Sequence, residues 1–272
     1  MIVHVERADD ARLDAFRWRE RQLASRADRL ETVGSGMFVA EGDLVVERAL
    51  VAGREPVALL CAERLAPGFV SRVDDDIAVY VGDDDLRRDV TGLGVPLGVT
   101  GLFRRPPLQD PDSLFTTSRR IVVMEAVDNP TNLGAVVRSA AALGWDALVL
   151  DATSADPLAR RALRVSMGTG LVLPFARLTP EDSVASLLGR HECAAFALTP
   201  DASARAIGSF RVGGRDNDRI ALVLGSEREG LSPGALSAAT ERVRIPMHAG
   251  VDSLNVGAAA AIALHAFGPA AP

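Results

Sequence analysis

The sequence predicts an α/β fold in which a smaller α/β domain precedes a C-terminal α/β domain with a mostly parallel sheet. Four apolar runs of the C-terminal half show no polar alternation: IVVMEAV (121–127), ALVLD (147–151), CAAFALT (193–199) and RIALVLG (219–225). Such strands are typical of parallel sheets that helices cover on both faces. A stretch rich in proline and turn-forming residues, RRPPLQDPDSLFTTSRR, divides this half from the N-terminal one.

The length and composition fit two ordinary domains. The chain has 272 residues, of which 48% are hydrophobic and 24% charged, a common globular mixture. We place the first domain at 1–104, a linker at 105–118 and the second domain at 119–272. The net charge of −6 arises within the first 118 residues, and the remainder is neutral. This acidic balance argues against a generally basic nucleic-acid binder, although local arginine patches can still bind phosphate.

Residue types that are missing exclude several classes of protein. All 30 basic residues are arginine, so a Walker A nucleotide site and Schiff-base chemistry, which both need lysine, are excluded. Cys61 and Cys193 form no Cys-x-x-Cys pair, which favours a reducing compartment. No apolar run reaches the roughly 20 residues of a membrane helix, and the N-terminus is too acidic for a signal peptide. We therefore expect a cytoplasmic protein.

The N-terminal half begins with a segment that fits an arginine-rich amphipathic helix. Over residues 1–30 the candidate core positions are Leu13, Phe16, Leu23 and Leu30. A second helix is predicted to open at Gly42. Further along, we expect strands at 57–62 and 76–83, a short helix at 85–90, and a glycine-broken strand or loop at 94–103.

The C-terminal half alternates its apolar strands with helices. The segment 133–144 is helical, a helix with proline in its first turn starts at Pro157, and an alanine-rich helix closes the domain at 255–267. A further short strand is predicted at 243–247. Ligands of open α/β sheets bind beyond the carboxyl ends of the strands, so polar residues and glycines at those junctions are the candidate site residues.

The first such segment is DNPTNLGAVVRSAAALG. Asn132 precedes the predicted helix, where its side chain can cap free backbone N–H groups. Arg138 lies six residues further on, among alanines that allow close packing. It is either a solvated helix residue or a group that binds a phosphate or carboxylate.

The second segment is LVLGSEREGLS. A strand ends at Gly225, and Gly230 closes a loop that carries Glu227. Glycine at a strand end permits a ligand to approach the main chain closely, although a plain hydrophilic turn has the same pattern. No Gly-x-Gly-x-x-Gly follows any strand, which argues against a nicotinamide or flavin Rossmann enzyme.

The third segment is RIPMHAGVDSLNVGAAAAIALHAF. Here a strand runs through a loop into a helix, with Ser253 and Asn255 in the N-cap region. A capped helix after a loop is common and does not by itself indicate a ligand.

Other candidate groups carry less weight. The four histidines, His4, His191, His248 and His265, show no metal-ligand spacing with each other or with the cysteines, and we expect no metal site. The Asp triplets 74–76 and 83–85 lack the pattern of a calcium loop. The arginines at 160, 161 and 164 are either a solvated helix face or a contact to RNA phosphates.

Taken in this order, the three segments resemble the SpoU/TrmH family of RNA ribose 2′-O-methyltransferases, part of the SPOUT superfamily. The similar motifs are Asn132-x-Gly134-x-x-x-Arg138, then Gly225-Ser226-Glu227-x-x-Gly230, and finally Ile245-Pro246-Met247 with Ser253-Leu254-Asn255-Val256. The run Arg164-Val-Ser-Met-Gly168 also matches a family segment. Less specifically, FVAEGDLVVERAL is similar to the RNA substrate-binding module that precedes this domain in many members, which would make 1–104 the RNA-binding domain.

The resemblance implies a trefoil-knotted second domain that binds S-adenosylmethionine and works as a homodimer, with the site at the subunit interface. Chain periodicity alone does not indicate a knot, because knots are rare among folds. The cofactor-binding residues implied are Leu224, Gly225, Gly230, Ile245, Met247, Ser253 and Leu254.

The reaction implied is methyl transfer to a ribose 2′-hydroxyl of structured RNA, with ribosomal RNA favoured over transfer RNA. The catalytic candidates are Arg138, Asn132, Glu227 and Asn255. A free guanidinium rarely releases its proton, so we expect Arg138 to orient RNA phosphate and stabilise the developing alkoxide; a base role would need a strongly perturbed site. Glu227 would hold Arg138 or position the hydroxyl, and the two asparagines would fix the ribose or the arginine. The alternative is a non-catalytic RNA-binding or ribosome-associated protein on the same fold.

Overall fold

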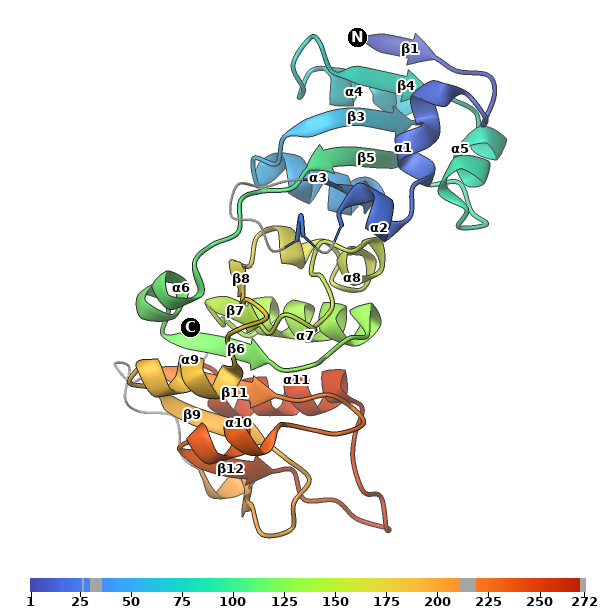
Figure 1. The fold of residues 1–272 in the computed structure, drawn as a ribbon. Coiled ribbons are helices and arrows are strands. Elements are labelled where there is room, and N and C mark those ends of the chain that lie inside the picture. The colour runs from blue at the N-terminus through green and yellow to red at the C-terminus, as the bar shows by residue number, and fades with distance from the viewer. Residues whose placement is uncertain (26, 30–35, 211–218, 270–272) are drawn as a thin grey trace. The chain divides into compact units, whose positions relative to one another are not determined.

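The computed structural model describes residues 1–25, 27–29, 36–210 and 219–269 and divides the chain into two compact units (Figure 1). The first unit comprises Met1–Pro107 together with Leu158–Val172, and the second comprises Leu108–Pro157 together with Leu173–Pro272. The segment 158–172 therefore interrupts the second unit in sequence but packs with the first. The range 105–118, placed as a linker from the sequence, contains helix α6 (Pro111–Thr117).

The first unit is built on a five-stranded sheet in the order β1-β4-β3-β5-β2. Strands β1 (Ile2–His4), β4 (Ala78–Val81) and β3 (Pro56–Cys61) are parallel, whereas β5 (Val99–Arg104) and β2 (Met37–Glu41) pair antiparallel. Before the linker, the helical elements of this unit are η1 (Ala11–Leu13), α1 (Asp14–Arg17), α2 (Glu20–Leu23), α3 (Asp43–Val51), η2 (Glu63–Leu65), α4 (Ala66–Val70) and α5 (Asp84–Thr91). The helix predicted to open at Gly42 is α3, and the segment left open as a strand or loop forms β5.

The helix predicted over residues 1–30 is wrong. The segment forms β1 and then only short helical pieces, η1, α1 and α2. Asp10 accepts a hydrogen bond from the amide of Arg12 and starts η1, and the chain leaves α1 at Trp18 in extended conformation. Leu13, Phe16 and Leu23 are nevertheless buried as expected, because these short turns still direct them into the core. Leu30 lies outside the described residues.

Helix α8 (Arg160–Val165) packs on β2 of the first unit through a buried ion-pair cluster. The Glu41 side chain is 1% exposed and accepts from Arg160 Nη1 at 2.9 Å and from Arg164 Nη1. Arg160 also donates to the carbonyls of Phe16 (2.6 Å) and Trp18 (3.0 Å). These two arginines are therefore bound to protein groups and do not form a solvated face. Pro157 lies before the helix, whose N-cap is Ala159.

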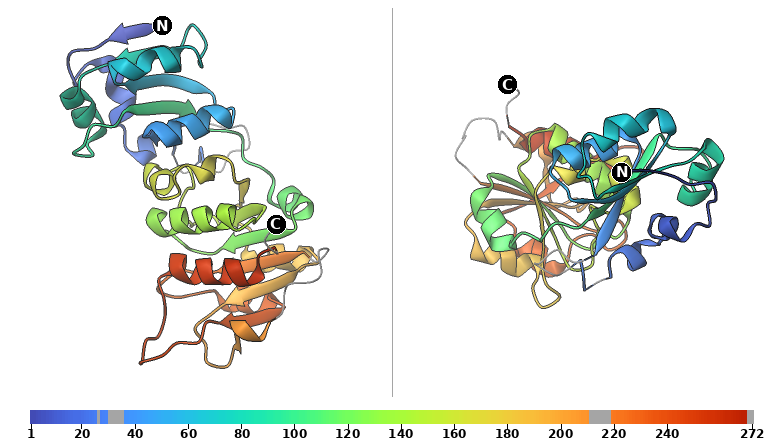
Figure 2. Two further views of the ribbon diagram at one scale, coloured as in Figure 1. Left: turned by 180° about the vertical axis from the view of Figure 1, so that it is seen from behind. Right: turned by 90° about the horizontal axis from the view of Figure 1, so that it is seen from above.

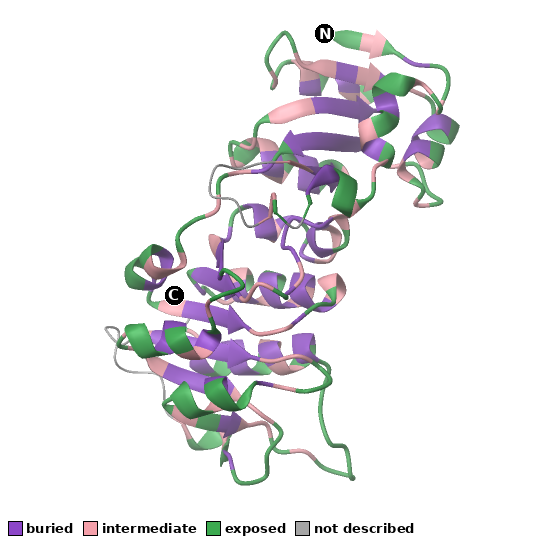
Figure 3. Cartoon of the chain, in the orientation of Figure 1, coloured by how far each residue is buried: buried purple, intermediate pink, exposed green. Residues whose placement is uncertain are grey.

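The second unit contains a seven-stranded parallel sheet in the order β10-β12-β9-β11-β6-β7-β8. The strands are β6 (Arg120–Met124), β7 (Ala147–Leu150), β8 (Phe175–Arg177), β9 (Ala194–Leu198), β10 (Arg205–Ala206), β11 (Ile220–Leu224) and β12 (Glu241–Arg244). The predicted apolar runs form β6, β7, β9 and β11, which are almost wholly buried (Figure 3). Because all strands are parallel, their carboxyl ends share one edge of the sheet.

Helices cover both faces of this sheet. Ile121, Val123 and Val149 face a core formed with α6, α9 (Val184–Arg190) and α10 (Pro233–Ala238). On the other face, Phe196 stacks on Phe267 of α11 (Val256–Phe267), with ring centroids 4.4 Å apart. Helix α11 packs beside α7 (Pro130–Ala142), and the two are seen side by side in Figure 2. Helices on both faces of the sheet are expected for strands whose residues do not alternate between polar and apolar.

Two short 3-10 turns, η3 (Thr169–Leu171) and η4 (Ile207–Ser209), complete the elements. Among the described residues, no helix is both long and apolar enough to cross a membrane.

Candidate functional site

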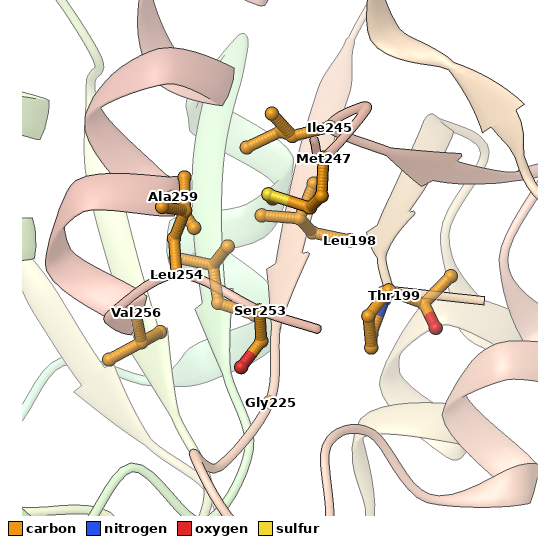
Figure 4. A pocket seen from close by; sticks show the side chains of 11 residues that line it. Leu198, Thr199, Gly225, Ile245, Met247, Ser253, Leu254, Val256 and Ala259 are labelled. Carbon is orange, nitrogen blue, oxygen red and sulfur yellow. The ribbon is translucent and has the colours of Figure 1, made fainter. Parts of the chain in front are cut away.

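A pocket opens at the carboxyl ends of three adjacent strands, β9, β11 and β12 (Figure 4). Its walls are mostly apolar and come from the strand ends, from the chain after β12 and from the start of α11. The lining residues are Leu198, Thr199, Pro200, Leu224, Gly225, Ile245, Met247, Ser253, Leu254, Val256 and Ala259. Six of the seven residues expected from the sequence to bind the cofactor are thus brought together in one place; Gly230 does not line the pocket.

Gly225 and Gly230 shape the loop that leaves β11. The amide of each of Ser226 and Gly230 donates to the carbonyl of the other, at 3.2 and 3.1 Å, which closes the loop. A Cβ on Gly225 would lie 2.3 Å from the carbonyl carbon of Gly230, so only glycine fits there. Gly230 itself has φ of +71°, a conformation that glycine adopts without strain. The second glycine therefore acts on the pocket indirectly, by folding the loop.

Three polar side chains from separate segments form a hydrogen-bonded cluster at the same edge. Asn132 Nδ2 donates to Glu227 Oε1 at 2.5 Å, and Asn255 Nδ2 donates to the same oxygen at 2.9 Å. Asn255 Nδ2 also donates to Asn132 Oδ1 at 2.9 Å. Three of the four predicted catalytic residues are therefore in contact, and they tie the start of α7 to the β11 loop and to α11.

The two asparagines hold their places for different reasons. Asn255 is the N-cap of α11, where its Oδ1 accepts from the amides of Gly257 and Ala258. The expectation that Asn132 caps α7 is wrong: the cap is Asn129, which is followed by proline at the first helical position, and Asn132 is buried inside the first turn. From this buried position its amide group donates to Glu227 and accepts from Asn255.

Arg138 does not join this cluster. Six positions along an α-helix place two side chains about 120° apart around its axis, and Arg138 is exposed on α7. Within the part of the chain that the structure describes, neither a hydrogen bond nor an ion pair is found for its guanidinium. Glu227 contacts the two asparagines and not Arg138.

The pocket residues that sequence reasoning missed follow β9 or begin α11. Leu198, Thr199 and Pro200 lie where β9 ends, and Val256 and Ala259 are helical. The signal for the first three was present, since the run CAAFALT ends in a threonine and is followed by a proline, at a strand end that faces the ligand edge.

The segment from Met247 to Leu254 contributes its two ends, Met247 and the pair Ser253 and Leu254, to the wall of the pocket. It turns at Ala249 and Gly250, with φ of 57° and 71°, and the amide of Val251 donates to the carbonyl of His248. The cavity measures about 90 Å³, which is small beside the roughly 300–1,000 Å³ of typical ligand sites.

The described residues hold no group of three or more His, Cys, Asp or Glu side chains that could bind a metal ion. The polar groups described at this edge are the amides of Asn132 and Asn255, the carboxylate of Glu227, and the hydroxyls of Thr199 and Ser253.

Comparison with known proteins places this domain in a family. The model described as the SpoU rRNA Methylase family matches residues 119–265, a range that includes the pocket and the polar cluster. The chain belongs to the SpoU rRNA methylase family. The match covers more than half of the chain and confirms the resemblance seen in the sequence motifs.

Individual relatives of this SpoU methylase extend over nearly its whole length. It is 37% identical over 262 residues to an uncharacterised tRNA/rRNA methyltransferase of Mycobacterium bovis, covering 94% of this chain and 88% of the relative. It is 27% identical over 247 residues to the 23S rRNA (guanosine(2553)-2′-O)-methyltransferase RlmP of Bacillus subtilis, covering 90% and 92%.

The fold of the SpoU methylase is shared with solved structures. The crystal structure of an AdoMet-bound rRNA methyltransferase from Sinorhizobium meliloti matches with a TM-score of 0.80 at 22% identity, covering 98% of this chain and 97% of that one. The predicted α/β class with a mostly parallel sheet is confirmed; the trefoil knot stays a prediction.

Proposed function

We propose that this SpoU methylase transfers a methyl group from S-adenosylmethionine to a ribose 2′-hydroxyl of RNA, with ribosomal RNA as the favoured substrate. The observation that carries the proposal is the juxtaposition of the apolar pocket with the Asn132–Glu227–Asn255 cluster at one sheet edge. The Bacillus subtilis relative is named for 2′-O-methylation of 23S rRNA, and the Sinorhizobium meliloti structure contains AdoMet, which supports both the reaction and the cofactor.

The pocket residues suit an adenosine-bearing cofactor. Leu198, Ile245 and Leu254 offer apolar surface to a purine ring, and the main chain at the ends of the strands offers donors and acceptors to its edge. S-adenosylmethionine supplies the methyl group as an electrophile on sulfur. The protein's part is to hold this group and the ribose hydroxyl in reactive alignment, which provides much of the rate of such transfers.

The polar cluster can orient the ribose hydroxyl. Oε1 of Glu227 accepts from both asparagine amides, so the orientation of the carboxylate is fixed. No partner of Oε2 is found among the described residues, and this oxygen is available to accept a hydrogen bond from the hydroxyl. Arg138 carries the positive charge for an RNA phosphate or for the developing alkoxide; its guanidinium is a poor base.

We propose further that a second copy of the chain completes the site around Arg138. Helices α7 and α11 pack together, and small or apolar residues of both are exposed, among them Ala142, Ala258, Ile262 and Ala266. We expect Ile262→Glu to convert a dimer into monomers and to abolish transfer. Sedimentation velocity of the wild type and the variant measures this; a monomeric wild type would contradict it.

We assign RNA binding to the N-terminal unit and to local arginines. The experiment that tests the function is transfer of labelled methyl groups from S-adenosylmethionine to RNA, followed by mapping of 2′-O-methyl positions in RNA from cells with and without the gene. RNA binding without any transfer would instead support a non-catalytic RNA-binding protein.

The cofactor assignment makes a separate prediction. Ala259→Leu should fill the pocket and raise the Kd for S-adenosylmethionine at least tenfold, or about 1.4 kcal/mol, because Ala259 lines the wall. Ala238→Leu, on the exposed face of α10, is the matched control and should leave the Kd unchanged. Calorimetric titration before and after chelator treatment measures both; loss of binding on chelation would show that a metal is required.

A further inference from the structure

The chain between β6 and α7, residues 125–129, is held from two sides by loops that follow other strands. On one side, Glu125 accepts hydrogen bonds from the Ser232 amide (2.7 Å) and hydroxyl (2.8 Å). On the other side, the amide of Ala126 donates to Asp151 Oδ1 and that of Val127 donates to Ser154 Oγ, both at 3.1 Å. This segment leads directly into the helix turn that carries Asn132.

Ala126 has an unusual backbone conformation. Its φ is 54°, in the left-handed region that is disfavoured for any residue with a Cβ. The conformation turns the chain from the end of β6 toward Asn129, the cap of α7. Asp151 binds the amide of this very residue, so its carboxylate stabilises the turn where the backbone most needs support.

Asp151 is itself fixed in place after β7. It accepts hydrogen bonds from the Ser154 amide (2.8 Å) and hydroxyl (2.5 Å) and from the Thr153 hydroxyl. Burial opposes ionisation, but the bonds from Ser154, Thr153 and Ala126 outweigh it, and the pKa of Asp151 lies below its usual range. The carboxylate is therefore a charged acceptor of constant orientation.

A buried arginine supports the loop that carries Asp151. Arg177, at the end of β8, donates from Nη1 to the carbonyls of Asp151 and Ser154, both at 2.8 Å, and from Nη2 to the carbonyl of Ala155 at 2.7 Å. The loop after β7 is thus a rigid support on which the turn at Ala126 rests.

We infer that Asp151 is a positioning residue for methyl transfer, which acts through the turn at Ala126 to place Asn132 against Glu227. The inference rests on the proposed function. Asn132 reaches Glu227 and Asn255 only while the first turn of α7 stays in place. Displacement of a reacting arrangement by about 1 Å can cost about 10² in rate.

The experiment compares kcat per folded molecule, the KM for RNA and the Kd for S-adenosylmethionine in four variants. Asp151→Ala should lower kcat about 100-fold with the Kd nearly unchanged. Ala126→Gly alone should resemble the wild type. Combined with Asp151→Ala, it should restore kcat at least about tenfold, because glycine adopts positive φ without help from the carboxylate. Asp151→Asn keeps one acceptor oxygen and should lose about tenfold or less.

Asp146→Asn is the matched control. Asp146 precedes the same strand, β7, and its carboxylate also accepts from two amides, those of Arg119 and Arg120, but at the opposite edge of the sheet. It should lower stability at most and leave kcat unchanged.

The outcomes separate the inference from the proposed function. A wild type without methyl transfer overturns both. An active wild type whose Asp151→Ala variant keeps its kcat, or loses it with no recovery when Ala126→Gly is added, overturns the inference alone. If Asp151→Ala does not fold, Asp151→Asn with and without Ala126→Gly decides the same question. The inference is supported if Asp151→Asn lowers kcat and adding Ala126→Gly restores it. The inference is overturned if Asp151→Asn leaves kcat unchanged or if adding Ala126→Gly restores nothing.

Discussion

Arg138→Ala is expected to lower kcat for RNA methylation about 10²–10³-fold, or roughly 3–4 kcal/mol, while the Kd for S-adenosylmethionine stays near the wild-type value. The physical reason is that a charge aimed at a developing alkoxide contributes in the transition state and little in the ground state. Arg138 lies outside both the pocket and the polar cluster, so its removal leaves the cofactor's surroundings intact.

The exposure of Arg138 gives this prediction a clear alternative. A solvated helix arginine without a protein partner would change stability by no more than about 0.5 kcal/mol and leave the rate unchanged. Single-turnover methylation with the folded fraction determined by thermal unfolding distinguishes the two. Arg138→Lys should restore little activity, because an ammonium group lacks the planar, two-pronged donor geometry. Wild-type turnover in Arg138→Ala would remove the catalytic assignment.

The second unit was largely predictable because its signals are local. The strand segments 121–124 and 220–224 are apolar throughout, and a parallel sheet covered on both faces is the environment that such runs require. The pocket residues were found because Gly225 falls at a strand end, where ligands collect, and because the motifs around Gly225 and Ser253 resemble those of the family. Asn132 was misplaced at the cap, although the pair Asn129 and Pro130 carries the stronger N-terminal signal.

The first unit was less predictable because its contacts are distant in sequence. A helical spacing of Leu13, Phe16 and Leu23 also suits three short turns on a sheet, and periodicity cannot separate the two over so few residues. Strand β1 has three residues and owes its existence to pairing with β4, more than 70 positions away. The contact of Glu41 with α8 likewise joins residues more than 100 positions apart, so no local sequence pattern predicts it.

Glu41→Ala is expected to destabilise the first unit by about 3–5 kcal/mol, the cost typical of removing one partner from a buried ion pair. The side chain of Glu41 is 1% exposed and neutralises both Arg160 and Arg164. Without it, Arg160 would stay largely buried against the carbonyls of Phe16 and Trp18 and would lose its ion-pair partner. Urea unfolding of the full-length protein measures the change.

The matched control for Glu41 is Glu55→Ala, because Glu55 also pairs with an arginine of the first unit but is exposed. Its partner is Arg104 at 2.8 Å, and both side chains are more than half exposed, so the expected loss is at most about 1 kcal/mol. Equal effects of the two substitutions would contradict the buried-cluster argument.

The same cluster predicts that α8 loses its packing partners in a chain lacking residues 1–104, because Leu163 of α8 is fully buried and α8 belongs to the first unit. The proposed RNA-binding role of the N-terminal unit is therefore better tested by point substitutions of its exposed arginines than by its removal. Removal would expose apolar residues of the 158–172 segment, and a loss of RNA affinity would then be mixed with a loss of folding.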